Sequence, residues 1–245
     1  MFFCSSGQHE RRAAGAGERR GDGVRLLLLN TCGAEGSAAL ADTALPQPVV
    51  AAETLPGRGS SEQLLPVLHR LFKVAGWPVS ELGAVAVVHG PGSFTGVRVG
   101  LSAAKGLCAA TGGRMIAISR LALVAASVEA DGETLALLDA GRGEFYAGFY
   151  RGRECLSEQL LRREEVLELL ASRTPVTCEA RVRELLPEVD GLRLVEEPGA
   201  VLILRLAVER IAAEEWTDVV TIDANYLRRT DAELLVERRA AAESA

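Results

Sequence analysis

Lysine is almost absent from this chain, and aromatic side chains are scarce. Only Lys73 and Lys105 occur among the 245 residues, and Phe, Trp and Tyr together make up 4%. The 33 acidic side chains outnumber the 27 basic ones, which gives a formal net charge of −6. Proteins that hold nucleic acid neutralise its phosphates with clustered lysines and arginines, whereas the arginines here are scattered. The composition therefore argues against a chain that binds nucleic acid by itself.

Paired cysteines and long apolar runs are lacking as well. The five cysteines lie far apart and form no C-x-x-C pair, which indicates reduced thiols rather than a disulfide framework or a zinc site. No apolar run approaches the roughly 20 residues that a membrane-spanning helix needs. The first residues, Met1-Phe2-Phe3-Cys4, lack the basic segment of a signal peptide. We therefore expect a cytoplasmic protein that does not contact a membrane.

The most informative stretch is residues 89–100, His-Gly-Pro-Gly-Ser-Phe-Thr-Gly-Val-Arg-Val-Gly. It follows a short β-branched run that predicts a buried strand, and it leads into a predicted helix at 97–110. Ser93 or Thr95 is expected to cap this helix. Such a strand–loop–helix unit points backbone N–H groups at whatever lies above the loop.

The fingerprints of two common phosphate loops do not fit this stretch. A P-loop needs Lys followed by Ser or Thr after its last glycine, and here Val97-Arg98 follow Gly96. The dinucleotide fingerprint needs a third glycine where Thr95 stands. The remaining interpretations are a tight turn that lets the helix pack closely, or a loop that holds a small anion.

The helix after the loop carries its glycines and small residues in stripes. Gly96, Gly100, Ala103 and Leu107 form one stripe at helical spacing. Each glycine weakens a helix by about 1 kcal/mol relative to alanine, which is tolerated where another backbone approaches closely. That backbone belongs either to the sheet of the same chain or to a partner helix, and helix propensity does not separate the two.

The apolar periodicity predicts a mixed α/β protein with two similar halves. The first half is expected to contain strands at 25–30, 35–41, 48–54, 84–89 and 114–118 and helices at 61–75 and 97–110. The second is expected to contain a helix capped by Ser119, strands at 134–139, 144–150, 153–157 and 175–178, and helices at 163–171, 180–186 and 200–214. In each half a three-stranded meander precedes alternating helix and strand, which indicates a duplicated domain.

Residues 90–107, Gly-Pro-Gly-Ser-Phe-Thr-Gly-Val-Arg-Val-Gly-Leu-Ser-Ala-Ala-Lys-Gly-Leu, closely resemble the signature of the TsaB (YeaZ) family. Further resemblances follow in the family's order at Leu28-Leu29-Asn30-Thr31, Arg58–Pro66, Leu138–Tyr146 and Tyr226-Leu227-Arg228. The resemblance implies the actin-like, Hsp70-like ATPase (ASKHA) fold with two similar mixed-sheet subdomains and a degenerate nucleotide site. The expected divisions are a disordered extension at 1–23, subdomains at 24–118 and 119–230, and a tail at 231–245.

The family's function implies a non-catalytic subunit rather than an enzyme. Members support addition of threonylcarbamoyl to the adenosine next to the tRNA anticodon, by binding a TsaD-like catalytic subunit together with a TsaE-like ATPase. The resemblance further implies a homodimer when the TsaD-like subunit is absent, contact with tRNA only through the complex, and no cofactor or metal. The implied partner interface consists of Leu64, Leu68, Phe72, Leu101, Ala104 and Cys108. The implied signature loop consists of Gly90, Pro91, Gly92, Ser93, Phe94, Thr95, Gly96 and Arg98.

Several single residues have side chains that could serve chemistry, and each also has a simpler role. Asn30 stands where catalytic relatives of the fold carry a metal-binding Asp, and a neutral amide is a poor Mg²⁺ ligand. Asp139 and Glu144 flank the second-half hairpin, and turn chemistry explains Asp139 better than a catalytic pair does. His89 ends a strand beside the loop, where a hydrogen-bonded histidine is the simpler expectation.

Arg98 lies on the first turn of the helix, where the helix dipole disfavours a cation. It is therefore expected to have a specific partner within the chain or across an interface. Two rival functions remain: a small-molecule kinase on the same fold, and a nucleotide- or anion-binding module that uses the 89–100 loop.

Overall fold

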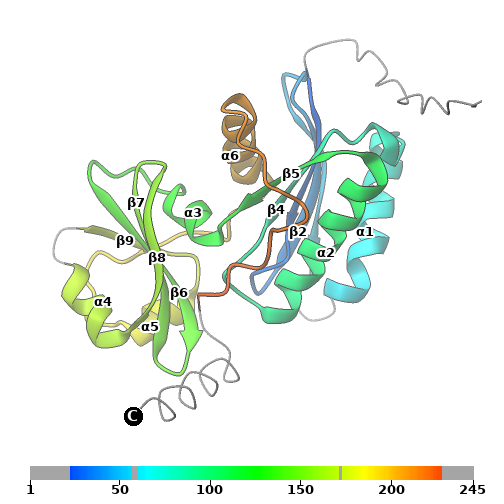
Figure 1. Cartoon of the computed structure of the whole chain (residues 1–245). Coiled ribbons are helices and arrows are strands. Elements are labelled where there is room, and N and C mark those ends of the chain that lie inside the picture. Colours follow the sequence, from blue (N-terminus) through cyan, green and yellow to red (C-terminus); the bar gives the residue numbers. More distant parts are fainter. Residues whose placement is uncertain (1–22, 57–59, 171–172, 228–245) are drawn as a thin grey trace, which may run out of the picture.

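The computed structural model describes residues 23–56, 60–170 and 173–227 (Figure 1). The extension at 1–22 and the tail after residue 227 lie outside the described residues, so the expectations for both ends remain untested. Within the described part, no helix combines the length and apolarity needed to cross a bilayer.

The first sheet has the strand order β3-β2-β1-β4-β5. Its strands are β1 (Arg25–Asn30), β2 (Gly36–Asp42), β3 (Val49–Leu55), β4 (Ala84–Val88) and β5 (Arg114–Ile118). The first three form an antiparallel meander, and β4 and β5 continue the sheet parallel to β1. Helices α1 (Ser60–Ala75) and α2 (Phe94–Thr111) cover one face, and α6 (Ala200–Ala212) covers the other (Figure 1).

The second sheet repeats this topology. Read from its outer edge, the order is β8-β7-β6-β9-β10. The strands are β6 (Glu133–Gly141), β7 (Glu144–Arg151), β8 (Glu154–Arg162), β9 (Arg173–Thr177) and β10 (Arg193–Leu194). Again a meander comes first and two parallel strands follow. Helices α4 (Arg163–Leu169) and α5 (Ala180–Leu185) cover one face, and α3 (Arg120–Ala125) covers the other.

The repeated topology confirms the predicted duplicated fold. The central strand of the first sheet is apolar throughout because both of its faces are buried: Leu26 and Leu28 point to one side, Leu27 and Leu29 to the other. The short 3-10 helix η1 (Val79–Glu81) and strand β10 were not predicted, since both are too short to show a period.

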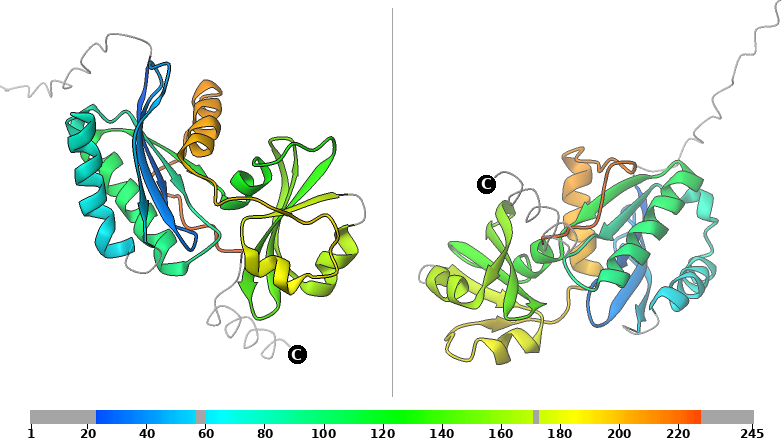
Figure 2. Two further views of the ribbon diagram at one scale, coloured as in Figure 1. Left: turned by 180° about the vertical axis from the view of Figure 1, so that it is seen from behind. Right: turned by 60° about the horizontal axis from the view of Figure 1, so that its bottom comes forward.

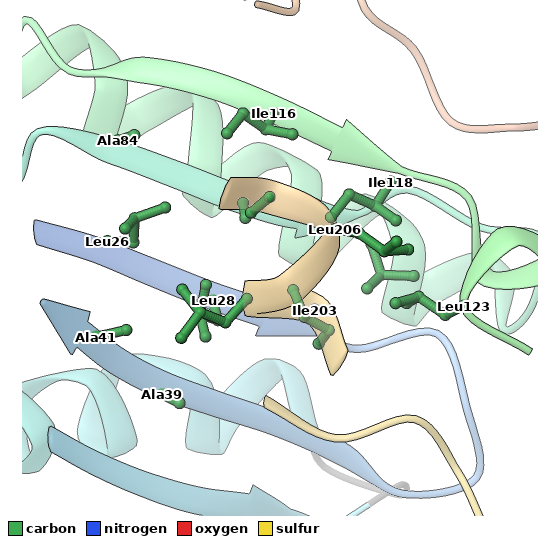
Figure 3. Packing of buried hydrophobic residues seen from close by; sticks show 14 of the residues in the cluster. Leu26, Leu28, Ala39, Ala41, Ala84, Ile116, Ile118, Leu123, Ile203 and Leu206 are labelled. Atoms are coloured by element: carbon green, nitrogen blue, oxygen red, sulfur yellow. The ribbon is translucent and has the colours of Figure 1, made fainter. Parts of the chain in front are cut away.

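The C-terminal part of the chain returns to the first sheet. Ile203 and Leu206 of α6 pack among Leu26, Leu28 and Ile116 (Figure 3). Beyond α6, Thr217 forms a bridge with Met115. The expected division, with one subdomain running through 119–230, therefore needs correction. The core places α6 and the segment to 226 with the first sheet, because α6 covers an apolar face that would otherwise be exposed.

Viewed from two further directions, the two sheets with their helices lie side by side, joined by the chain at α3 and again before α6 (Figure 2). This arrangement leaves the turn after β1, the start of α2 and the β6–β7 hairpin at the junction between the halves.

Candidate functional site

The signature loop connects β4 to α2 as the sequence indicated, but the helix begins earlier. Ser93 is the N-cap, and its hydroxyl accepts a hydrogen bond from the Gly96 N–H at 3.3 Å. The cap position confirms one of the two predicted candidates, while Thr95 lies inside the helix. The Gly90 carbonyl accepts from the Arg120 N–H at 2.7 Å, which ties the loop to the start of α3.

The glycines of the loop and helix pack against the turn after β1. A Cβ atom on Gly92 would lie 2.3 Å from the Cys32 carbonyl oxygen, and one on Gly96 would lie 2.0 Å from the Thr31 carbonyl oxygen. A Cβ on Gly100 would lie 2.3 Å from the Thr31 hydroxyl oxygen. That hydroxyl donates to the Gly96 carbonyl at 2.6 Å. For these three glycines, close approach therefore serves packing within the chain rather than a partner helix.

The six side chains expected at a partner interface lie inside the protein. Each is at most 8% exposed and belongs to the core between the first sheet and its two helices: Leu64, Leu68, Phe72, Leu101, Ala104 and Cys108. The residue assignment is therefore corrected, because an amphipathic stripe indicates burial without indicating against what. Other residues form the outward faces of these two helices. Leu65 on α1 is 70% exposed, and a Cβ added to Gly106 on α2 would meet nothing within 4 Å.

Arg98 finds its partner within the chain. Its guanidinium carbon lies 3.6 Å from the centre of the Phe94 ring and 5.5 Å from that of Tyr226. The two rings are 5.8 Å apart. Cation–π contact thus holds the charge that the helix dipole disfavours.

A cleft of about 560 Å³ lies between the two halves. The first half contributes the turn after β1 and the start of α2; the second contributes α3, the β6–β7 hairpin and the start of α5. The lining residues are Cys32, Gly33, Ala34, Gly92, Ser93, Arg120, Asp139, Ala140, Gly141, Tyr146 and Glu179. Six of the lining positions come from motifs singled out in the sequence: Gly92, Ser93, Asp139, Ala140, Gly141 and Tyr146.

A buried ion network closes the base of this cleft. Arg120, only 2% exposed, binds Glu197 with two parallel hydrogen bonds, Nε to Oε1 at 2.9 Å and Nη2 to Oε2 at 2.5 Å. Its Nη1 donates to Glu179 Oε1 at 2.8 Å. Burial acts to raise the pKa of Glu197, but Arg120 and the hydrogen bonds from Cys178 and Asn30 outweigh it and hold this pKa below the usual range.

Asn30 takes part in the same network. Its Nδ2 donates to Glu197 Oε1 at 3.1 Å, and its Oδ1 accepts from the Cys32 N–H at 3.1 Å. An Asp at this position would place a second carboxylate against Glu197 without a proton to share. The side chain that catalytic relatives would use for a metal is therefore engaged in a structural contact.

The residues of the cleft do not fit a nucleotide with its Mg²⁺ ion. Glu179 and Glu197 are both paired with Arg120, and Asp139, which also lines the cleft, adds a third carboxylate. A carboxylate pair around a single guanidinium offers a polyphosphate more repulsion than attraction. Burial raises the pKa of Cys32 and of Cys178 to about 12 each, so neither thiol supplies a thiolate nucleophile. Within the described part of the chain, no three His, Cys, Asp or Glu side chains form a metal-binding group.

A second polar cluster joins the halves on the other side of the junction. Glu158 accepts hydrogen bonds from the Ser119 hydroxyl at 2.5 Å, from the Tyr150 hydroxyl, and from Asn225 Nδ2 at 2.6 Å. His89 lies near this cluster, and burial holds its pKa below the usual value. Its Nδ1 is buried and has no hydrogen-bond partner among the described residues. The imidazole does form a hydrogen bond with the backbone of Asp223, so the simpler expectation of a hydrogen-bonded histidine is met, although not at Nδ1.

Turn chemistry accounts for Asp139, as expected. Its Oδ1 accepts from the Gly141 N–H at 2.7 Å at the start of the hairpin turn. Its own N–H donates to Glu179 Oε2 at 2.8 Å, which links the hairpin to the ion network.

The residues that sequence reasoning missed are Arg120, Glu179 and Glu197. Arg120 did leave a signal, since it is the one charged residue in the apolar run from Ser119 to Val128. An arginine in a helix that is otherwise apolar requires a buried partner. Glu179 and Glu197 lie in polar segments, where nothing marks them as that partner.

Comparison with known proteins places the chain among tRNA-modification proteins. A family model described as "TsaD: tRNA N6-adenosine threonylcarbamoyltransferase" matches residues 54–228. The "tRNA threonylcarbamoyladenosine biosynthesis protein TsaB" of Bacillus subtilis (strain 168) is 32% identical over 111 residues, or 45% of this chain. The match covers 48% of that protein, so the chain spans about half the length of this relative.

Two further similarities extend over most of the chain. The TsaB protein of Haemophilus influenzae is 30% identical over 192 residues, which cover 70% of this chain and 80% of that protein. The solved structure "YeaZ from Pseudomonas aeruginosa" has 27% sequence identity and a TM-score of 0.69, and the match covers 83% of this chain and 100% of that one.

Proposed function

The chain belongs to the TsaB (YeaZ) family, and from this we propose that it is a non-catalytic subunit of the machinery that makes threonylcarbamoyladenosine in tRNA. Its task is to bind and activate a TsaD-like catalytic subunit, and a TsaE-like ATPase joins the complex. The chain works in the cytoplasm and meets tRNA only through this complex. Without a TsaD-like subunit it pairs with a second copy of itself.

The observation that carries the non-catalytic role is the ion network at the base of the cleft. Actin-like enzymes need this space for a nucleotide and its metal. Here Arg120 and Glu197 form a bidentate pair at the base of the cleft, and Asn30 donates to the same carboxylate. The side chains at this position, Asn30, Arg120 and Glu197, therefore bind one another and hold the two halves together instead of binding a nucleotide.

The outward face of α1 and α2 is the proposed partner surface. On α2 this face carries small residues, among them Ser102, Gly106 and Ala109, which are all exposed. A glycine on an exposed helix face costs about 1 kcal/mol relative to alanine, and packing within the chain does not account for Gly106, because its Cβ position is open. Close approach of a partner helix would account for it.

The test is binding of the purified chain to the TsaD-like protein of the same genome. We expect Gly106→Arg to weaken binding at least tenfold, because an arginine would hold the two helices apart. Ala212→Arg is the matched control, since Ala212 is an exposed residue at the end of α6 on the opposite face of the sheet. Equal binding by the wild type and by Gly106→Arg would remove this surface from the proposal.

The alternative function is a small-molecule kinase on the same fold, and calorimetry distinguishes it from a non-catalytic subunit. Titration with ATP and Mg²⁺ should give no heat of binding if the cleft is held by its own ion network. Saturable binding followed by phosphoryl transfer would favour the kinase.

A further inference from the structure

The three side chains Phe94, Arg98 and Tyr226, here termed the lip patch, form an exposed group beside the cleft. Phe94 directly follows the cleft-lining Ser93, and Tyr226 lies in the segment after α6. Phe94 is 54% and Tyr226 42% exposed, and Arg98 is exposed as well. Large aromatic side chains so exposed on a protein with few aromatic residues require an explanation.

The lip patch holds its arginine in place without neutralising it. The guanidinium lies 3.6 Å from the Phe94 ring centre, and within the described residues no carboxylate forms an ion pair with it. Contact with a ring face is not a hydrogen bond, so a guanidinium held in this way keeps its N–H donors for another acceptor. The charge is therefore fixed in position and still able to take an anion.

One cation suits a single carboxylate better than a nucleic acid. Binding of a phosphate backbone requires several lysines or arginines along it. Along the same flank of α2, the other cation is Lys105, whose Nζ donates to the Val220 carbonyl at 3.4 Å and which interacts with Asp218. Arg98 alone thus remains available, and a guanidinium matches one carboxylate with two parallel hydrogen bonds.

We propose that the lip patch is an anchor for a carboxylate on the surface of a partner protein, with the two rings packing against the apolar groups around that carboxylate. Arginine and tyrosine are enriched among the residues that dominate protein–protein binding. This inference rests on the proposed function, since it names the chemistry by which a subunit of the same complex is bound. It concerns a surface separate from Gly106.

The test measures dissociation constants of the full chain for the TsaD-like protein, and of their complex for the TsaE-like protein. We expect Arg98→Met and Tyr226→Ala each to weaken at least one of these associations tenfold or more. Tyr226→Phe keeps the ring and should stay within twofold of the wild type. Arg181→Met is the control, because Arg181 is an exposed arginine of α5 that pairs with the neighbouring Glu184. Added salt should weaken wild-type binding more than binding by Arg98→Met.

Each other outcome overturns the proposal. If the wild type binds and all variants bind equally, the lip patch is not an anchor, while the proposed function stands. If the variants change only the affinity of the assembled complex for tRNA, the ligand is RNA. If only the homodimer is lost, the occupant is a second copy. If the wild type binds neither protein, the proposed function fails together with the inference.

Discussion

The same substitution at two glycines of α2 should have opposite effects on stability. At Gly106 an added Cβ meets nothing within 4 Å, so Gly106→Ala should gain the full helix preference of alanine, about 1 kcal/mol. At Gly96 the added Cβ would lie 2.0 Å from the Thr31 carbonyl oxygen, and this backbone atom has no flexible side chain to move away.

The cost at Gly96 follows from two terms. Overpacking of a tight contact costs about 1–3 kcal/mol, and displacement of α2 would stretch the hydrogen bond from the Thr31 hydroxyl to the Gly96 carbonyl, which contributes about 1 kcal/mol. The helix preference of alanine offsets up to about 1 kcal/mol. Gly96→Ala should therefore lower the free energy of unfolding by about 1–3 kcal/mol.

Urea unfolding at 25 °C, followed by circular dichroism, measures both effects. With an m-value of about 2 kcal/mol per molar urea, the unfolding midpoint should fall by roughly 1 M for Gly96→Ala and rise by about 0.5 M for Gly106→Ala. The measurement is made at low protein concentration, because a homodimer would add its own stability. Stability changes of the same sign in both variants would refute the assignment of Gly96 to packing within the chain.

Four further substitutions test the buried polar groups and the helix cap. Arg120→Met leaves two carboxylates without their partner and should cost about 3–5 kcal/mol in thermal or urea unfolding, and adding Glu197→Gln should recover part of it. The pKa of Glu197 is lowered in the folded state, so its charge contributes fully to the free energy of unfolding above the ordinary pKa near 4.5. This contribution is lost as the pH falls through the lower pKa of the folded state. Glu197→Gln should therefore reduce the dependence of the free energy of unfolding on pH in this range. His89 also has a lowered pKa through burial, so protonation favours the unfolded chain and stability should fall as the pH drops below 6.5, a slope that His89→Gln should remove. Ser93→Ala removes the cap of α2 and should cost about 1 kcal/mol, measured by the same unfolding curves, and an unchanged midpoint would contradict the cap.

Much of the fold was predictable because the apolar pattern of each element is strong. Alternation and apolar runs located every strand of the two sheets except the two-residue β10, and the repeated order of elements indicated the duplication. The sequence did not predict which sheet α6 packs against, since its apolar face fits either sheet. The returning segment is fixed by contacts such as the bridge between Thr217 and Met115, which leave no pattern in the local sequence.

The candidate site was predictable only where local chemistry determines it. The Ser93 cap and the turn at Asp139 follow from short-range rules. The assignment of buried side chains such as Ala104 to a partner surface was wrong, because a helical stripe reports only that a face is buried. The ion network around Arg120 joins residues 59 and 77 positions apart in the sequence, and such pairings depend on the tertiary fold.

The measurement that tests the account most directly is a calorimetric titration of the purified chain, first with ATP and Mg²⁺ and then with the TsaD-like protein of the same genome. The account predicts no nucleotide binding and a saturable association with the protein. Turnover of ATP by the chain alone, without any association, would contradict it.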